Sequence, residues 1–296
     1  TEKQTVHYFS VKSDDSANPD GTNWNNDGAT GNDAVAAGRY AKAYGNQSQA
    51  TGRNAWAIGG YSQASGYNAV AAAEKGIDAA TYNALSDEEK QNYKLNTQSE
   101  GTKNTSLYYR TKFKEYTNDE FNALPVMEQH RLTNEKGYRY DKEKEVWTLA
   151  PGAVAIGHAA KAIGLSTLAV GDLAEATAKY AVAVGRETEA TDVGNTALGY
   201  YAKAKGLRST ALGIAARATD FESMAVGPYA RAEGKVSLAL GSKANAKGNN
   251  SIAMGLRSSS IGESSIALGG IAKTQAQGSV AIGMMAESRQ KGSVAL

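Results

Sequence analysis

The stretch Ser237-Leu-Ala-Leu-Gly241, followed by Ala244-Asn-Ala-Lys-Gly248, is one unit of a repeat that fills the second half of the chain. Glycine recurs every fourteen residues from Gly157 to Gly283 without a missed position. Self-similarity at a fixed period is the signature of an architecture in which each unit packs against its neighbours. The repeat therefore predicts a solenoid, which serves as a ruler or a display surface far more often than as an enzyme.

Each unit divides into two halves of seven residues, and a glycine or a polar residue ends each half. Five extended residues and a two-residue bend account for the seven. A helix would need a period of 3.6 residues, and the glycines would break it. One coil is therefore predicted to hold two short strands, with successive coils stacked in parallel about 4.8 Å apart.

The two halves differ in the faces they present. In the first half, Val154 and Ile156 point to one side and Ala155 to the other, so both faces are apolar. In the second half, alanines alternate with polar residues such as Lys203 and Lys205, which predicts a half-buried strand. A coil of two strands cannot bury the outer face of its first strand, so we expect copies of the same chain to cover it. The pattern leaves the number of copies open.

The chain divides into four segments. Residues 1–30 are expected to form a strand, a loop and a cap that closes the roll. Residues 31–73 form a first roll block with the same seven-residue spacing. In this block two polar, second-half strands follow one another, so the alternation of the two strand types shifts by one strand. Residues 74–150 form a charged, aromatic-rich insertion, and residues 151–296 form the main roll.

The insertion predicts a small α+β excursion from the roll. Ser86-Asp-Glu-Glu89 and Thr117-Asn-Asp-Glu120 are capping-box starts of short helices. Tyr82-Asn-Ala-Leu85 and Phe121-Asn-Ala-Leu124 open similar segments, which suggests a duplicated unit. Repeat proteins accept insertions at turns on one face, which is often the binding face.

Composition and motifs argue against several function classes. The net charge of +2 gives no general affinity for nucleic acid or membranes, and no apolar run reaches membrane-span length. The chain has no cysteine, and its three histidines lack metal-ligand spacing. No phosphate-binding glycine loop is present, and Asp192 and Asp220 read as left-handed turn residues. We therefore expect no catalytic residue, metal or cofactor.

Two groups of basic residues are candidate ligand-binding sites. One is a basic and aromatic strand of the insertion, in which aromatic and arginine side chains are typical interface anchors. The other is a stripe on the outward face of the second-half strands, and a solvated face that keeps the solenoid soluble is the alternative for it. The candidates are Lys103, Tyr108, Tyr109, Arg110, Lys112, Phe113 and Lys114 in the insertion, and Lys203, Lys205, Arg217 and Arg231 in the stripe.

The unit Ser-Val-Ala-Ile-Gly-x-x-Ala-x-Ala-x-Gly-x-x, as at Ser279-Val-Ala-Ile-Gly283, closely resembles the head repeat of trimeric autotransporter adhesins of the Yersinia type. The resemblance covers about 34–73 and 153–296. It implies a left-handed parallel β-roll, a homotrimer, and a place on the outer surface of a Gram-negative bacterium. It also implies a neck, a stalk and a membrane anchor further along the chain. Because the chain starts without Met and stops at Leu296 in mid-repeat, we expect it to be a piece of a longer protein.

The insertion and Val6-His-Tyr-Phe-Ser-Val11 also resemble the head of the ubiquitous surface protein A adhesins of Moraxella. The implied function is multivalent adhesion to host extracellular matrix glycoproteins, with fibronectin first and laminin or collagen next. A structural spacer or a self-association module is the alternative. A left-handed β-helix acyltransferase is disfavoured because such enzymes use hexapeptide repeats, and an ice-binding roll is disfavoured because the outward positions are irregular.

Overall fold

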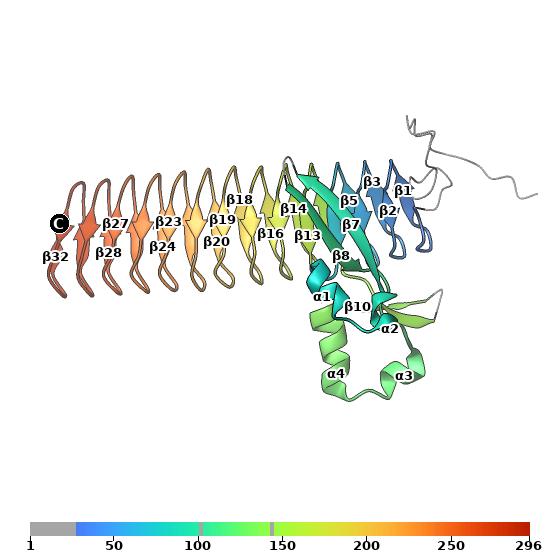
Figure 1. Cartoon of the computed structure of the whole chain (residues 1–296). Coiled ribbons are helices and arrows are strands. Elements are labelled where there is room, and N and C mark those ends of the chain that lie inside the picture. Colours follow the sequence, from blue (N-terminus) through green and yellow to red (C-terminus); the bar gives the residue numbers. More distant parts are fainter. Residues whose placement is uncertain (1–27, 101–102, 143–144) are drawn as a thin grey trace, which may run out of the picture. The chain divides into compact units, whose positions relative to one another are not determined.

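The computed structural model describes residues 28–100, 103–142 and 145–296, so Val6–Val11 and most of the expected cap lie outside the described residues. The chain forms two compact units, residues 1–159 and 160–296. Both are built from parallel β-coils, and the second consists of coils alone (Figure 1). The predicted parallel β-roll is confirmed.

The coils of unit 2 alternate between two parallel sheets, which we call the apolar sheet and the polar sheet. The apolar sheet holds the first-half strands: β14 (Leu168–Val170), β16 (Val182–Val184), β18 (Thr196–Leu198), β20 (Thr210–Leu212), β22 (Met224–Val226), β24 (Leu238–Leu240), β26 (Ile252–Met254), β28 (Ile266–Leu268), β30 (Val280–Ile282) and β32 (Val294–Ala295). The polar sheet holds the second-half strands: β13 (Lys161–Ile163), β15 (Glu175–Ala176), β17 (Glu189–Ala190), β19 (Lys203–Ala204), β21 (Arg217–Ala218), β23 (Arg231–Ala232), β25 (Asn245–Ala246), β27 (Ser259–Ser260), β29 (Lys273–Thr274) and β31 (Glu287–Ser288).

Alanine fills the space between these two sheets. Ala239 and Ala253 of the apolar sheet pair in register, as Ala232 and Ala246 do in the polar sheet, and all four are fully buried. Larger side chains alternate with them on the outside, so the interior is as thin as the small residues predicted. Serines such as Ser237 donate from Oγ to the carbonyl three residues earlier, at 2.6 Å in this case. Most of these serines therefore stabilise their own turn rather than joining one coil to the next.

The turns are hydrogen bonded from coil to coil as tightly as the strands. Gly241 N donates to Val226 O and Lys243 N donates to Pro228 O, both at 2.8 Å. Gly255 has φ +129, and a Cβ built on it would lie 2.4 Å from the carbonyl oxygen of Gly269. The first-half glycine series is therefore unbroken, because these positions combine left-handed backbone with a close approach of the next coil.

Every replaced glycine falls in the second-half series, at Ala178, Asp192, Asp220, Ala276 and Gln290. Most intact positions there, such as Gly248, need space for the next coil but are not left-handed, and Gly164, with φ +117, is the exception. The interpretation of Asp192 and Asp220 as left-handed residues is wrong. The Asp220 carboxylate accepts from Phe221 N at 2.7 Å, and the left-handed residue is Glu222, with φ 50.

Unit 1 contains two shorter sheets of the same kind. Sheet 1 has the order β1 (Val35–Ala37), β3 (Gln49–Thr51), β5 (Gln63–Ser65) and β12 (Val154–Ile156). Sheet 2 has the order β2 (Lys42–Ala43), β4 (Trp56–Ala57) and β6 (Val70–Ala72).

The slip of the repeat changes which sheet of unit 1 carries apolar residues outward. Strands continue to alternate between the sheets, but two polar halves in succession place the apolar halves Trp56–Ile58 and Val70–Ala72 on sheet 2. Sheet 1 receives the polar strands β3 and β5 instead. After the insertion, the next coil strand following β6 is β12, and both strands are apolar first halves. Because strands alternate between the sheets, β12 lies in sheet 1, which again carries a first-half strand.

The insertion forms two helix–hairpin segments. The first has α1 (Ala79–Asn83), α2 (Asp87–Lys90) and the antiparallel hairpin of β7 (Tyr93–Glu100) and β8 (Lys103–Arg110). The second has β9 (Tyr116–Thr117), α3 (Asn118–Asn122), α4 (Val126–His130), a π-helical turn at Arg131–Lys136, and β10 (Tyr138–Asp141) paired with β11 (Val146–Leu149). Both predicted capping boxes are present, at Ser86 and Thr117.

We predict that Gly255→Ala lowers the free energy of unfolding by about 3 kcal/mol or more, because the new Cβ meets the next coil and the backbone is left-handed. Gly278→Ala is the control: Gly278 has φ +63 and open space around its Cβ position, so its replacement should cost about 1 kcal/mol. Urea unfolding followed by circular dichroism measures both. Equal losses would contradict the proposed role of the close approach.

Candidate functional site

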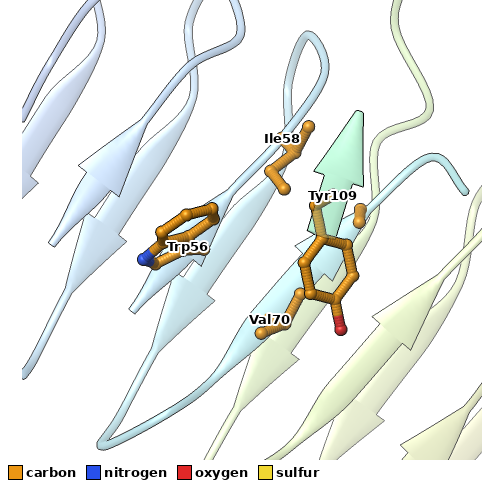
Figure 2. Packing of buried hydrophobic residues seen from close by; sticks show 5 residues of the cluster. Trp56, Ile58, Val70 and Tyr109 are labelled. Atoms are coloured by element: carbon orange, nitrogen blue, oxygen red, sulfur yellow. The ribbon is translucent and has the colours of Figure 1, made fainter. Parts of the chain in front are cut away.

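The insertion covers the apolar face that the slip creates on sheet 2. Trp56, Ile58 and Val70 are nearly or fully buried there, and Tyr109 of β8 packs on them with only 1% of its surface exposed. Figure 2 shows the Tyr109 ring lying over Val70 beside Ile58 and Trp56. The ring centroids of Trp56 and Tyr109 are 6.4 Å apart. Tyr109 is therefore a core residue, and its predicted role as a ligand contact is not supported by its burial.

Each of the two helix–hairpin segments contains one stacked pair of aromatic rings, as expected for a duplicated unit. Tyr82 of α1 stacks on Tyr108 of β8, with centroids 3.8 Å apart and planes inclined by 7°. Phe121 of α3 stacks in the same way on Trp147 of β11, at 3.9 Å and 11°. Tyr82 and Phe121 hold equivalent places in the repeated Asn-Ala-Leu motif. Each pair joins a helix to a hairpin, so Tyr108 has a structural role. Tyr108 is also half-buried, so part of its surface stays accessible.

The remaining insertion candidates gather where β8 ends. The expected strand through Phe113 stops at Arg110, and the next residues leave the hairpin in an irregular segment. The side chains of Lys112 and Lys114 are exposed there, while Phe113 is half-buried against both aromatic clusters. Lys103 stands in β8, but its side chain is outside the described part of the structure.

A basic hollow of about 290 Å³ lies beside this segment. Arg110 lies over the Phe113 ring at 5.7 Å, and Lys114 Nζ lies 4.4 Å from the centroid of Tyr116. Burial raises the pKa of Tyr138 to about 12, and its hydroxyl donates to the Lys114 carbonyl at 2.9 Å. The hollow is lined by cations, aromatic rings and one carboxylate: Glu74, Arg110, Phe113, Lys114, Tyr116, Arg131, Leu132, Lys136, Tyr138 and Leu149. Such a surface suits an acidic partner.

A second hollow of about 540 Å³ lies between the outer face of sheet 2 and strand β7. It belongs to none of the sites predicted from the sequence. Its lining combines aromatic rings, cations and amides: Tyr40, Lys42, Tyr44, Arg53, Asn54, Trp56, Tyr67, Asn68, Lys94 and Leu95. The slipped aromatic strand at Trp56 was the only signal in the sequence, and the lining residues come from four separate segments of the chain.

An acidic neighbour on an adjacent coil pairs with two of the four residues of the predicted basic stripe of unit 2. Glu189 forms ion pairs with both Lys203 and Lys205. Partial burial of Glu189 opposes its ionisation, but hydrogen bonds from the two lysines outweigh this and lower the pKa of its carboxyl group. Exposed pairs of this kind contribute little stability. The single carboxylate of Glu189 offsets part of the positive charge of the two lysines, which makes this end of the stripe less suited to docking an acidic partner.

Arg217 and Arg231 are the part of the stripe that keeps its charge. They are exposed and stand directly opposite each other on β21 and β23. No ion pair to either is found within residues 160–296. The structure thus places Lys203, Arg217 and Arg231 in register on successive strands, and only Lys203 of these three has an ion pair among residues 160–296.

The outer face of the apolar sheet is only partly covered. Leu240 and Met254 are paired in register and are 37% and 38% exposed, and Ile282 is 42% exposed. This row of outward apolar residues matches the face that the sequence predicts to be covered by another copy.

The coils match a known protein family. The family model of the YadA head domain repeat matches residues 29–48, 50–72, 162–188, 196–216, 232–258 and 260–284. The matched segments are similar to YadA head repeats. These repeats support an adhesin head of the trimeric autotransporter type, and the family is generally non-enzymatic. No curated protein matches the chain.

The insertion falls outside every segment that matches the YadA head repeat. Both hollows involve residues that the repeat does not specify, so their chemistry belongs to this chain rather than to the repeat. In the part of the chain that the structure describes, no cluster of three metal-ligating side chains is present. Among the same residues, no helix is both long and apolar enough to cross a bilayer.

We predict that Tyr109→Ala loosens the insertion from sheet 2, because removing a buried aromatic ring typically costs about 3–5 kcal/mol. Hydrogen–deuterium exchange should rise at β4, β6 and β8, while strands of unit 2 keep their protection and act as the internal reference. Tyr108→Ala, which alters a half-buried ring on the opposite side of β8, should leave β4 and β6 protected. Unchanged exchange at β4 and β6 in Tyr109→Ala would show that the ring does not hold the insertion in place.

Proposed function

We propose that this adhesin head assembles as a homotrimer on the bacterial surface and binds a host extracellular matrix glycoprotein through the basic hollow of the insertion. Fibronectin is the first expected ligand, followed by laminin or collagen. The observation that carries the proposal is exposed Lys114, which lines a hollow together with Arg110 and aromatic rings, with exposed Lys112 two residues before it in the chain. The likeness of the insertion to the ubiquitous surface protein A adhesins of Moraxella is part of the same proposal.

The hollow combines two features of protein-binding surfaces. Cations at its rim attract an acidic segment and speed its approach, and aromatic rings supply contact area with little loss of side-chain entropy. A trimer presents three copies, so modest affinity at each hollow becomes strong binding to a fibrous ligand that offers several sites.

Support for the trimer comes from the outer face of the apolar sheet. A continuous row of partly exposed leucine, isoleucine and methionine side chains is unfavourable in water and favours association. The face is the same on every copy, as a closed symmetric assembly requires.

A spacer or self-association role is the second candidate, and one observation favours it for unit 2. Its polar sheet pairs most of its charges between neighbouring coils, as Lys161 and Glu175 do at 3.3 Å. A neutralised, regular surface suits a module that sets distance. This role is compatible with ligand binding by the insertion.

We predict that Lys112→Glu/Lys114→Glu weakens binding to immobilised fibronectin, laminin or collagen by about tenfold or more, since the rim charges are reversed in each of three copies. Arg217→Glu/Arg231→Glu tests the remaining charged part of the stripe in the same assay. Surface plasmon resonance measures binding, and circular dichroism with light scattering confirms folded oligomers. Unchanged binding by both variants would sink the proposal.

Point variants are a sharper test than removal of residues 75–150. The insertion buries Trp56, Ile58 and Val70, so its deletion would expose an apolar face and create a new sticky surface. Normal matrix adhesion by the deleted form would still favour the spacer role.

We also predict that Leu240→Asp/Met254→Asp converts the trimer into single chains, because both side chains would be buried between copies. Both are partly exposed in the single chain, so its fold should be retained. Asn245→Asp, on the polar sheet, is the matched control and should remain trimeric. Light scattering coupled to size exclusion gives the mass, and an unchanged trimer mass in the double variant would place the interface elsewhere.

A further inference from the structure

The 540 Å³ hollow between sheet 2 and strand β7 has the composition of a small-molecule site. Its volume falls within the range of about 300–1,000 Å³ that is typical of ligand pockets. We propose that it binds an acidic sugar, namely a pyranose ring that carries a carboxylate. This site and ligand class are separate from the basic hollow and go beyond the proposed binding of matrix proteins.

Flat aromatic surfaces form much of the wall. Tyr44 and Trp56 stand on adjacent strands β2 and β4 with ring centroids 5.5 Å apart in an edge-to-face arrangement. Tyr40 and Tyr67 lie at the turns beside them, and each has an arginine over its ring. Aromatic rings with polar edges suit a ligand that has apolar C–H faces and hydroxyl groups around its rim.

The charges that line the hollow are positive. Lys42, Arg53 and Lys94 come from β2, from the turn before β4, and from β7, and no carboxylate is among the described lining residues. Arg53 and Lys94 are exposed, so their charged groups can reach a bound molecule. An arginine guanidinium binds a carboxylate through two parallel hydrogen bonds, which gives geometry as well as attraction. This charge selects an anionic ligand over a neutral sugar.

A row of asparagine amides supplies fixed hydrogen-bonding groups. Asn54 Nδ2 donates to Asn68 Oδ1 at 2.9 Å and to Asn96 Oδ1 at 3.3 Å. Asn54 and Asn68 are equivalent turn residues on successive coils, both left-handed with φ 56. Asn96, from β7, is fully buried and ties the hairpin to this row. Because the amides are held in place, their polar atoms are preorganised for ligand hydroxyl groups.

Two buried donors in this region have no partner among the described residues. They are the indole Nε1 of Trp56 and the amide Nδ2 of Asn96, on residues with 5% and 0% exposure. Figure 2 shows the Trp56 nitrogen at the end of the indole that points away from Ile58 and Tyr109. Buried donors are normally paired. Trp56 lines the hollow, which can admit an acceptor-rich ligand, and Asn96 lies behind it, next to the lining residue Leu95 and hydrogen bonded to Asn54.

A sugar fits these features better than a peptide or a nucleic acid. A nucleic acid would need a run of cations along its backbone, whereas the chain has a net charge of only +2 and this hollow offers a local group of three. A peptide could supply a carboxylate to the cations, but it lacks the several hydroxyl groups around one compact ring that the row of fixed amides would match.

The test is to titrate the purified head, as the intact chain, with N-acetylneuraminic acid and with glucuronic acid. Indole N–H resonances followed by NMR report binding at Trp56, which is assigned with Trp56→Phe. We expect a saturable shift of the Trp56 resonance with at least one of the two acids. N-acetylglucosamine, acetate and a single-stranded oligonucleotide, tested in parallel, should give weaker or no shifts. Arg53→Gln/Lys94→Gln should weaken binding of the acid by about tenfold or more.

Lys112→Gln/Lys114→Gln is the matched control, because it removes the same number of charges from the segment at the basic hollow, where Lys114 is a lining residue. It should keep the Trp56 shift even if matrix binding is lost, so the two proposals can fail independently. Absence of a saturable shift with both acidic sugars overturns the inference. Equal binding of N-acetylglucosamine, preferential binding of the oligonucleotide, or full binding by Arg53→Gln/Lys94→Gln overturns it as well.

Discussion

The close stacking of main chain on main chain is the constraint on which the rest of this structure depends. N–H groups in strands donate to the following coil, as Leu238 N does to Ser251 O, and those in turns donate to the preceding coil, as Lys243 N does to Pro228 O. The spacing of coils is therefore set by hydrogen bonds over the whole circuit. A Cβ at Gly255 would lie 2.4 Å from the next carbonyl oxygen, which explains why the first-half series contains only glycine. Where the backbone is not left-handed, as at Ala276, the chain accepts other residues. The thin alanine interior follows from the same short circuit.

Such an interior buries little large apolar surface, and the arrangement of larger residues outside it decides how each part of the chain is covered. In unit 2 the larger apolar residues lie on one sheet, where they stay partly exposed in the single chain. In unit 1 the slip moves Trp56, Ile58 and Val70 to sheet 2, and the insertion covers them through Tyr109. The interruption of the repeat and the insertion are therefore linked: one creates an apolar face, and the other buries it.

The same link creates the places where small and large ligands can be recognised. Regular coils repeat one environment, and their charges are mostly neutralised by pairs such as Lys205 and Glu189 at 2.7 Å. The slip and the insertion bring unlike segments together, so cations, rings and amides meet in hollows that no single repeat encodes. Specific recognition is expected in such regions because a rigid scaffold holds varied loops.

The sequence by itself determined the parallel roll, its two kinds of strand, the buried alanines and the capping boxes at Ser86 and Thr117, because each depends on local periodicity or short-range hydrogen bonds. It also located the basic residues of the insertion. Only the tertiary structure decided that Tyr109 is core, that Lys203 and Lys205 are paired, and that Trp56 borders a hollow with Arg53 and Lys94. These outcomes depend on contacts between residues that are fourteen or more positions apart, and on the direction in which the insertion folds back. Neither is contained in the spacing of residues along one strand.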